Sequence, residues 1–144
     1  MHKRLNNEAE TLGFAKEFSA GLKPGDIIAL SGELGTGKSV LARALMRALG
    51  VLDEALPSPT YTIIQEYEGR GCRIAHMDWY RLEDADELEA IGVREYFQSP
   101  WICLIEWPER GLQLLPDETI HIKLHCIEDN QDARLLELND PKAK

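Results

Sequence analysis

The amino-acid sequence predicts an α/β fold in which helices flank a sheet of mixed parallel and antiparallel strands. An apolar run at 26–31 is typical of a buried strand, and a glycine-rich turn and a helical pattern follow it directly. Two β-rich runs, at 62–68 and 72–78, are joined by a Gly-Arg-Gly turn, which is typical of an antiparallel hairpin. A strand–turn–helix unit and a hairpin in one sheet require both kinds of strand pairing.

Length and composition predict one domain over residues 1–144. A chain of 144 residues, 44% of them hydrophobic, is long enough for one sizeable core. It has no run of about 18 apolar residues and no charged-then-apolar leader, so we expect a cytoplasmic protein that does not bind membranes. Cys72, Cys103 and Cys126 are odd in number and show no paired spacing, which favours reduced thiols in the same compartment.

The charge balance limits the kinds of partner. Lys and Arg total 16 against 25 Asp and Glu, a formal net charge of −9. Proteins that grip nucleic acid directly usually present a basic face, because phosphate neutralisation dominates that affinity. We therefore expect no tight direct binding of nucleic acid; if nucleic acid is involved, another subunit holds it.

Residues 1–25 are expected to form a lead-in helix with a packing role. Asn7 is a suitable N-cap because Glu10 follows three residues later. Apolar residues then recur at helical spacing, and Gly21 and Pro24 end the pattern.

Residues 32–39, Gly-Glu-Leu-Gly-Thr-Gly-Lys-Ser, match the phosphate-loop pattern G-x-x-x-x-G-K-[ST] in full. A strand precedes this loop and a helix follows it, up to a C-capping glycine at Gly50. Glycines let backbone N–H groups turn towards an anion, and the helix N-terminus adds its positive dipole end. Lys38 is expected between the β- and γ-phosphates, and the Ser39 hydroxyl on Mg²⁺. The pattern predicts a nucleotide-binding P-loop NTPase domain.

The proline-rich segment at 56–61 has two interpretations. It is either a stiff connection from helix to strand or a nucleotide-sensing loop. In the second case the hydroxyl of Ser58 or Thr60 faces Mg²⁺ or the γ-phosphate, as in a GTPase switch.

The end of the second hairpin strand carries several candidate site residues. Asp78 could position a water or accept its proton, because ligands bind beyond the carboxyl ends of strands; otherwise it is a turn acid. His76 is expected to be a structural strand residue rather than a metal ligand. Trp79 and Tyr80 either belong to the core or cover the nucleotide, and Arg81 contacts a phosphate, a partner or only solvent.

An acidic stretch at 83–90 begins a helix, with a short helix or turn at 93–97, and its acids are expected to be solvated. The apolar run at 102–105 ends in Glu106 and matches a Walker B strand, which delivers an acid to Mg²⁺. Glu106 is the first candidate for the metal-linked acid and Asp78 is its rival. The run also suits a central strand beside the phosphate-loop strand.

The C-terminal third predicts a short helix at 107–111, cut off by its last glycine, and then two strands at 118–127 and 133–138. His121 and His125 fall on the polar face of the first of these strands. Residues four positions apart would share one face of a helix, where they could bind a metal together. On a strand they only share the solvent-exposed face, so we expect no zinc site there.

Four motifs occur together: GELGTGKS at 32–39, SPTYT at 58–62, HMDWYRL at 76–82 and IEW at 105–107. In this order, within so short a chain, they resemble the TsaE (YjeE) family. The resemblance spans residues from about 10 to 125, and the joint occurrence is far more specific than the phosphate loop alone.

The resemblance implies a mixed α/β P-loop fold that binds ATP and Mg²⁺ and hydrolyses ATP slowly. The family supplies the ATPase component of the bacterial machinery that makes threonylcarbamoyladenosine on tRNA. It therefore also implies TsaB and TsaD as protein partners, with tRNA reached only indirectly, through the complex.

The resemblance assigns roles to particular residues. It places Lys38, Asp78 and Glu106 in catalysis, with Asp78 orienting the water, and Ser39 and Glu106 on the metal. Nucleotide contacts are implied for Glu33, Leu34, Gly35, Thr36, Gly37, Lys38, Ser39, Val40, Thr60 and Trp107. Ser39 stands where the family usually has Thr, which keeps the hydroxyl, and Trp79 stands where Leu is common, which alters packing near Asp78.

Two other functions remain open from the sequence. A small-molecule kinase would need an acceptor pocket and usually an arginine-bearing lid, and no long basic lid segment is visible. A non-catalytic nucleotide switch would bind ATP only to change its affinity for a partner.

Overall fold

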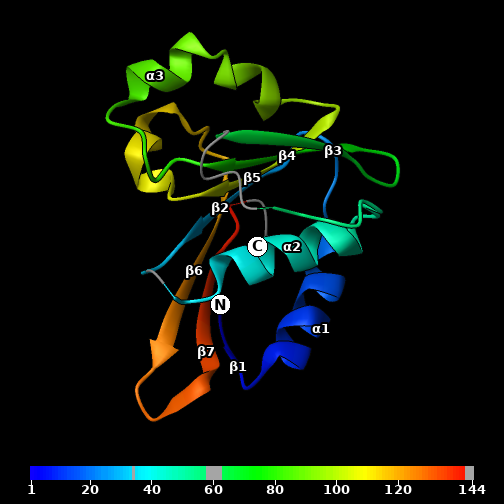
Figure 1. Ribbon diagram of the computed structural model, residues 1–144, viewed down its shortest axis with the longest axis vertical. Coiled ribbons are helices and arrows are strands. Elements are labelled where there is room, and N and C mark those ends of the chain that lie inside the picture. Colours follow the sequence, from blue (N-terminus) through cyan, green and yellow to red (C-terminus); the bar gives the residue numbers. More distant parts are fainter. Residues whose placement is uncertain (34, 58–62, 142–144) are drawn as a thin grey trace.

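The computed structural model describes residues 1–33, 35–57 and 63–141, and all seven of its strands belong to one sheet (Figure 1). The strand order is β1-β7-β6-β2-β5-β4-β3. The elements are β1 His2–Leu5, α1 Glu8–Ser19, β2 Ile27–Ser31, α2 Lys38–Ala48, β3 Ile64–Glu68, β4 Arg73–Asp78, α3 Ala85–Ala90, the 3₁₀ helices η1 Val93–Phe97 and η2 Pro108–Leu114, β5 Trp101–Glu106, β6 Ile120–Ile127 and β7 Asn130–Asn139.

The centre of the sheet is parallel and its flanks are antiparallel. Strands β6, β2, β5 and β4 run parallel, whereas β1–β7, β6–β7 and β3–β4 are antiparallel pairs. The predicted mixed sheet is therefore confirmed, as is the central position of β5 beside β2. Because parallel strands end at the same edge, Ser31, Asp78 and Glu106 all stand at one edge of the sheet.

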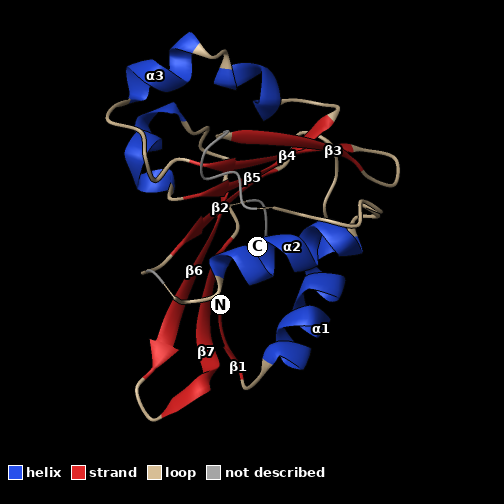
Figure 2. Ribbon diagram, viewed as in Figure 1, coloured by secondary structure: helices blue, strands red, loops and turns tan. Residues whose placement is uncertain are grey.

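Helices cover both faces of the sheet, and each face has its own apolar core (Figure 2). Alternation along the strands divides the side chains: Ile28 and Leu104 pack towards α1 and α2, whereas Ile27 and Cys103 pack towards α3 and the 3₁₀ helices. Trp79, for which two positions were open, is fully buried in the second core. Within the described part of the chain, no helix is long and apolar enough to cross a membrane.

The N-terminal segment differs in part from the predicted lead-in helix. The helix exists, and the Asn7 side chain caps it by accepting from the N–H of Glu10 at 2.9 Å. Residues 2–5, however, form the edge strand β1, which pairs antiparallel with β7. Only Leu5 of these residues is buried, so the strand is stabilised by ladder hydrogen bonds to a partner more than 120 residues away, which no local pattern reports.

Two boundaries near the C-terminus also differ. The predicted short helix at 107–111 is a 3₁₀ helix that continues to Leu114, with a non-helical kink at Gly111. A Cβ on Gly111 would lie 2.7 Å from Leu88 and 3.1 Å from Trp79, so tight packing of η2 against the second core explains the glycine. Strand β7 begins at Asn130 rather than at Ala133, because the connecting turn needs only two residues.

Candidate functional site

The phosphate loop joins the end of β2 to the start of α2, and its glycines have the backbone geometry that the motif requires. Gly32 has φ +140°, and a Cβ on it would lie 2.5 Å from the carbonyl oxygen of Leu124. Gly37 caps α2 with φ +92°. Both positions are strained for any residue with a side chain. The N-terminal end of α2 lines a cavity together with Asp78 and Glu106, which end β4 and β5.

Lys38 lies against its own loop in this structure. Its side chain is 5% exposed, and Nζ donates to the carbonyl oxygen of Gly32 and, at 3.3 Å, to that of Glu33. Nζ also lies 3.6 Å from the centroid of the Trp107 ring. Burial lowers the pKa of Lys38, and the nearby carboxylates of Glu106, Glu109 and Asp78 oppose that shift. The loop thus holds a partly desolvated positive charge.

Ser39 and Glu106 meet directly beneath the loop. The Ser39 hydroxyl donates to Oε1 of Glu106 at 2.9 Å, and Oε2 of Glu106 lies 2.7 Å from Nε2 of His76. Glu106 is 2% exposed. A hydroxyl and a carboxylate side by side at a helix N-terminus are hard oxygen donors, which suit Mg²⁺ held together with phosphate oxygens. The residues predicted to bind the metal therefore fit that ion.

Asp78 ends β4 directly opposite Glu106 in the parallel register. It is 7% exposed, and its Oδ1 accepts from the backbone N–H of Tyr80 at 2.9 Å. The two rival acids are thus brought to one place, and the contact with Ser39 belongs to Glu106. Asp78 lines the same cavity.

A cavity of about 540 Å³ collects these groups. It is lined by Gly35, Thr36, Gly37, Lys38, Ser39, Val40, Asp78, Tyr80, Arg81, Glu106, Trp107 and Arg134. Most of the predicted site residues therefore share one space. Leu34, Ser58 and Thr60, which the sequence also predicted at or near the site, lie outside the described residues.

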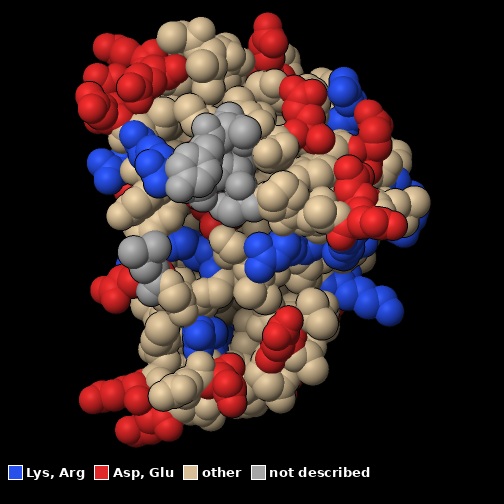
Figure 3. All heavy atoms as spheres, viewed as in Figure 1, with Lys and Arg blue, Asp and Glu red and all other residues tan. Residues whose placement is uncertain are grey.

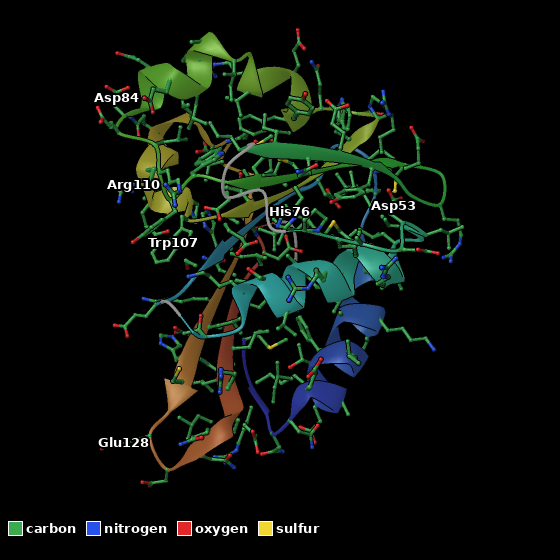
Figure 4. The ribbon with its side chains drawn as sticks, viewed as in Figure 1. Asp53, His76, Asp84, Trp107, Arg110 and Glu128 are labelled. Atoms are coloured by element: carbon green, nitrogen blue, oxygen red, sulfur yellow. The ribbon has the colours of Figure 1, made fainter. Side chains whose placement is uncertain are left out.

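Trp107 and Tyr80 form an aromatic wall between this cavity and a neighbouring one. Their ring centroids are 4.8 Å apart, and Trp107 has the left-handed backbone conformation, φ +59°. Both residues also line a second cavity of about 690 Å³, together with Glu33 and residues 123–126 of β6. Figure 4 shows Trp107 at the left, between η2 and the phosphate loop, and His76 between the sheet and α2.

Arg134 is a site residue that sequence reasoning missed. From β7 its Nε donates to the carbonyl oxygen of Thr36 at 2.9 Å and its Nη2 to that of Gly35 at 3.2 Å. The carbonyl of Thr36 and the N–H of Gly37 belong to one planar peptide and point in opposite directions. Holding the carbonyl therefore also fixes the direction of that N–H. In the sequence Arg134 is only one residue of a predicted strand, so no local signal identifies it.

Comparisons with known proteins show the family to which the chain belongs. The family model described as "Threonylcarbamoyl adenosine biosynthesis protein TsaE" matches residues 5–135. Among similar proteins, one from Haemophilus influenzae is 37% identical, covering 92% of this chain and 86% of its own length, and one from Bacillus subtilis is 38% identical, covering 89% and 79%. Both are named tRNA threonylcarbamoyladenosine biosynthesis protein TsaE.

A solved structure supports the same relationship at the level of the fold. The crystal structure of Bacillus subtilis YdiB superposes with a TM-score of 0.80 at 31% identity, covering 97% of this chain and 84% of that one. The family that the four motifs resemble is thereby confirmed. The chain belongs to the TsaE family.

Proposed function

We propose that this chain is a Mg²⁺-dependent ATPase that serves the threonylcarbamoyladenosine modification of tRNA. Relatives at 37% and 38% identity carry that biosynthetic role in their names, and the family supports a nucleotide-hydrolysing part in it. The observation that carries the proposal is the 2.9 Å contact between Ser39 and Glu106 beneath the phosphate loop. It joins the hydroxyl of one nucleotide motif to the acid of another across 67 positions of the chain.

In the proposed mechanism the chain's own groups bind and orient the nucleotide. Backbone N–H groups of the loop and the N-terminus of α2 hold the phosphates, and Lys38 adds its charge at the β- and γ-phosphates. Ser39 and Glu106 hold Mg²⁺, which when bound neutralises charge on the transferring phosphate. Asp78, which lines the cavity and lies opposite Glu106 in the sheet register, orients the attacking water.

The nucleoside half is proposed to lie on the side of the loop away from Glu106. Ser39 and Glu106, the proposed metal-binding residues, mark where the β- and γ-phosphates of the nucleotide lie. The rest of the phosphate chain therefore runs past Gly37 and Val40. A cavity of about 230 Å³ opens there between α1, the loop and the β6–β7 hairpin, and Val40 and Thr11 line it. Its lining contains both apolar and polar groups, as a base and a sugar require.

The chain is proposed to act through TsaB and TsaD in the cytoplasm and to leave tRNA to them. Its net charge is −9, and acids of α3 and the turn before it gather at one end of the face in Figure 3. Such a surface repels a polyanion, so tRNA contact is assigned to the partners.

The test measures ATP hydrolysis by the purified chain alone and with TsaB and TsaD, together with threonylcarbamoyladenosine formed on tRNA. We expect slow turnover alone, stimulation by the partners, and no modification when the chain is omitted. Fast hydrolysis that ignored the partners, or full modification without the chain, would contradict the proposal.

A non-catalytic nucleotide switch is a second candidate, favoured by the position of Lys38. Its Nζ is held by loop carbonyls and lies over Trp107, so nucleotide binding must rearrange these contacts. Asp78→Ala and Glu106→Ala separate the two functions. If both variants lost hydrolysis yet supported full tRNA modification, the switch would replace the ATPase.

A further inference from the structure

His76 is a polar strand residue that does not line the cavity. Its side chain is fully buried, and its Nε2 lies 2.7 Å from Oε2 of Glu106. Sequence analysis predicted only a structural residue at this position. Strand pairing of β4 with β3 and β5 uses backbone groups, so it does not require an imidazole here.

Both carboxylate oxygens of Glu106 have a partner, and the two partners come from different elements. Ser39 of α2 donates to Oε1, and His76 of β4 contacts Oε2. Rotation of the carboxylate about its own axis would break both contacts. The plane of the buried Glu106 carboxylate is therefore held from two sides.

Among the residues that the structure describes, His76 reaches the site through Glu106. In the parallel register of β4 with β5, His76 lies beside Leu104 and Asp78 beside Glu106. His76 is therefore two residues behind the sheet edge on the face that α2 covers, as Figure 4 shows. The carboxylate of Glu106 extends from Ser39 at the cavity to His76 behind it.

The other ring nitrogen of His76 shows that packing alone does not account for the imidazole. Nδ1 is buried and has no hydrogen-bond partner among the described residues. An unpaired buried polar atom costs free energy, so the core by itself would favour an apolar side chain here. The contact with Glu106 supplies the reason for a histidine.

We propose that His76 is a positioning residue that holds Glu106 in place for the divalent cation. The inference rests on the proposed Mg²⁺–nucleotide site. Ser39 and Glu106 would hold the cation, and the Ser39 hydroxyl would be able to give it a lone pair while still donating its O–H to Glu106. His76, which touches the other carboxylate oxygen and does not line the cavity, would keep the carboxylate oriented from behind. Partners of this kind are worth about 10–100-fold in metal affinity.

The experiment compares His76→Leu, which removes the donor, with His76→Gln, which keeps an N–H donor within reach of Glu106. ADP affinity is measured by calorimetry in EDTA and over a range of Mg²⁺ concentrations, and Mn²⁺ binding is followed by electron paramagnetic resonance. We expect unchanged ADP affinity in EDTA for both variants. The Leu variant should need about 10–100-fold more Mg²⁺ for half-saturation, and Gln should restore most of that loss.

Two controls isolate the route through Glu106. On a Glu106→Gln background, His76→Leu should raise the Mg²⁺ requirement by less than about twofold, because coupled residues are not additive. His121→Leu alters a strand histidine on the other side of β2, opposite Ala29, and should leave the Mg²⁺ requirement unchanged. If His76→Leu does not fold, His76→Asn replaces it, since its amide is too short to reach Glu106 as His76 does.

The outcomes that overturn the inference are distinct from those that overturn the proposed function. An unshifted Mg²⁺ requirement in the Leu variant, an equal loss of ADP affinity in EDTA, or a full shift on the Glu106→Gln background refutes the role of His76. A wild-type chain whose ADP affinity ignores Mg²⁺ refutes the proposed metal site, and the inference with it.

Discussion

The ammonium nitrogen of Lys38 lies 3.6 Å from the centroid of the Trp107 ring. This contact joins the residue that follows the last glycine of the phosphate loop to the residue that follows the Walker B acid. A cation over an aromatic face is stabilised by the ring quadrupole, by about 0.5–2 kcal/mol according to burial. The charge that is proposed to bind phosphate thus lies over an aromatic side chain in this structure.

Replacing Lys38 tests the assignment of the phosphate site. Lys38→Ala should lower ATP turnover by about 10²–10³-fold, because removing one donor aimed at charge that develops in a transition state costs about 2.7–4 kcal/mol. A steady-state ATPase assay measures the loss, with Arg43→Ala on the same helix as a control that keeps the loop intact. Normal turnover in the Lys38 variant would show that the phosphates bind elsewhere.

The burial of Lys38 predicts a pH dependence of the free energy of unfolding. Its pKa in the folded chain is below 10.5, so in the alkaline range the unfolded chain binds the proton more tightly. The contribution of Lys38 to stability therefore rises as the pH rises through its lowered pKa towards 10.5. We expect Lys38→Met to be at least as stable as wild type at pH 7. The difference between their free energies of unfolding, measured by urea titration, should shrink at high pH. A difference that widened with pH would contradict the sign.

Trp107 should report on nucleotide binding. Nucleotide must draw Lys38 Nζ away from the ring, so tryptophan fluorescence should change on addition of ADP. Trp107→Phe should abolish this change while keeping most of the affinity, because Phe still presents an aromatic face. Trp79→Phe is the matched control: Trp79 is buried in the core on the other face, and its loss should leave the change intact. If the fluorescence change were lost in Trp79→Phe and kept in Trp107→Phe, it would come from the core and not from Trp107.

Arg134 should contribute to nucleotide affinity by holding the loop. Arg134→Gln removes the bonds to Thr36 and Gly35, and we expect ADP affinity to fall by about tenfold or more, since charged hydrogen bonds are worth about 1.5–3 kcal/mol. Arg47→Gln is the control, because Arg47 makes the same kind of bond to the carbonyls of Val51 and Glu54. Calorimetry should find the ADP affinity of the Arg47→Gln variant unchanged. An equal loss of ADP affinity in both variants would mean a general effect on folding.

Gly111 tests the packing of η2 on the second core. Gly111→Ala would place Cβ 2.7 Å from Leu88 and 3.1 Å from Trp79, so we expect about 1–3 kcal/mol of destabilisation from overpacking. Gly13→Ala in α1 meets nothing within 4 Å and should instead stabilise by about 0.5–1 kcal/mol. Urea denaturation of the two variants should show opposite signs. No loss in the Gly111 variant would mean that η2 can shift freely.

Local patterns were sufficient for much of this protein. The phosphate loop, the Asn7 cap, the glycine turn of the β3–β4 hairpin and the apolar strand before Glu106 each depend on residues close together in sequence. Turn chemistry, capping and side-chain periodicity are local physics, so a single sequence reports them. The four motifs at 32–39, 58–62, 76–82 and 105–107, taken together, were enough to identify the family.

What the sequence by itself determined was therefore the mixed α/β class, the phosphate loop with its strand and helix, and the family. Only the tertiary structure decided that Glu106 rather than Asp78 contacts Ser39, that His76 stands behind Glu106, that Arg134 holds the loop, and that β1 completes the sheet edge. The physical reason is that each of these contacts joins residues at least 30 positions apart. Strand order and register bring them together, and neither leaves a pattern in the local sequence.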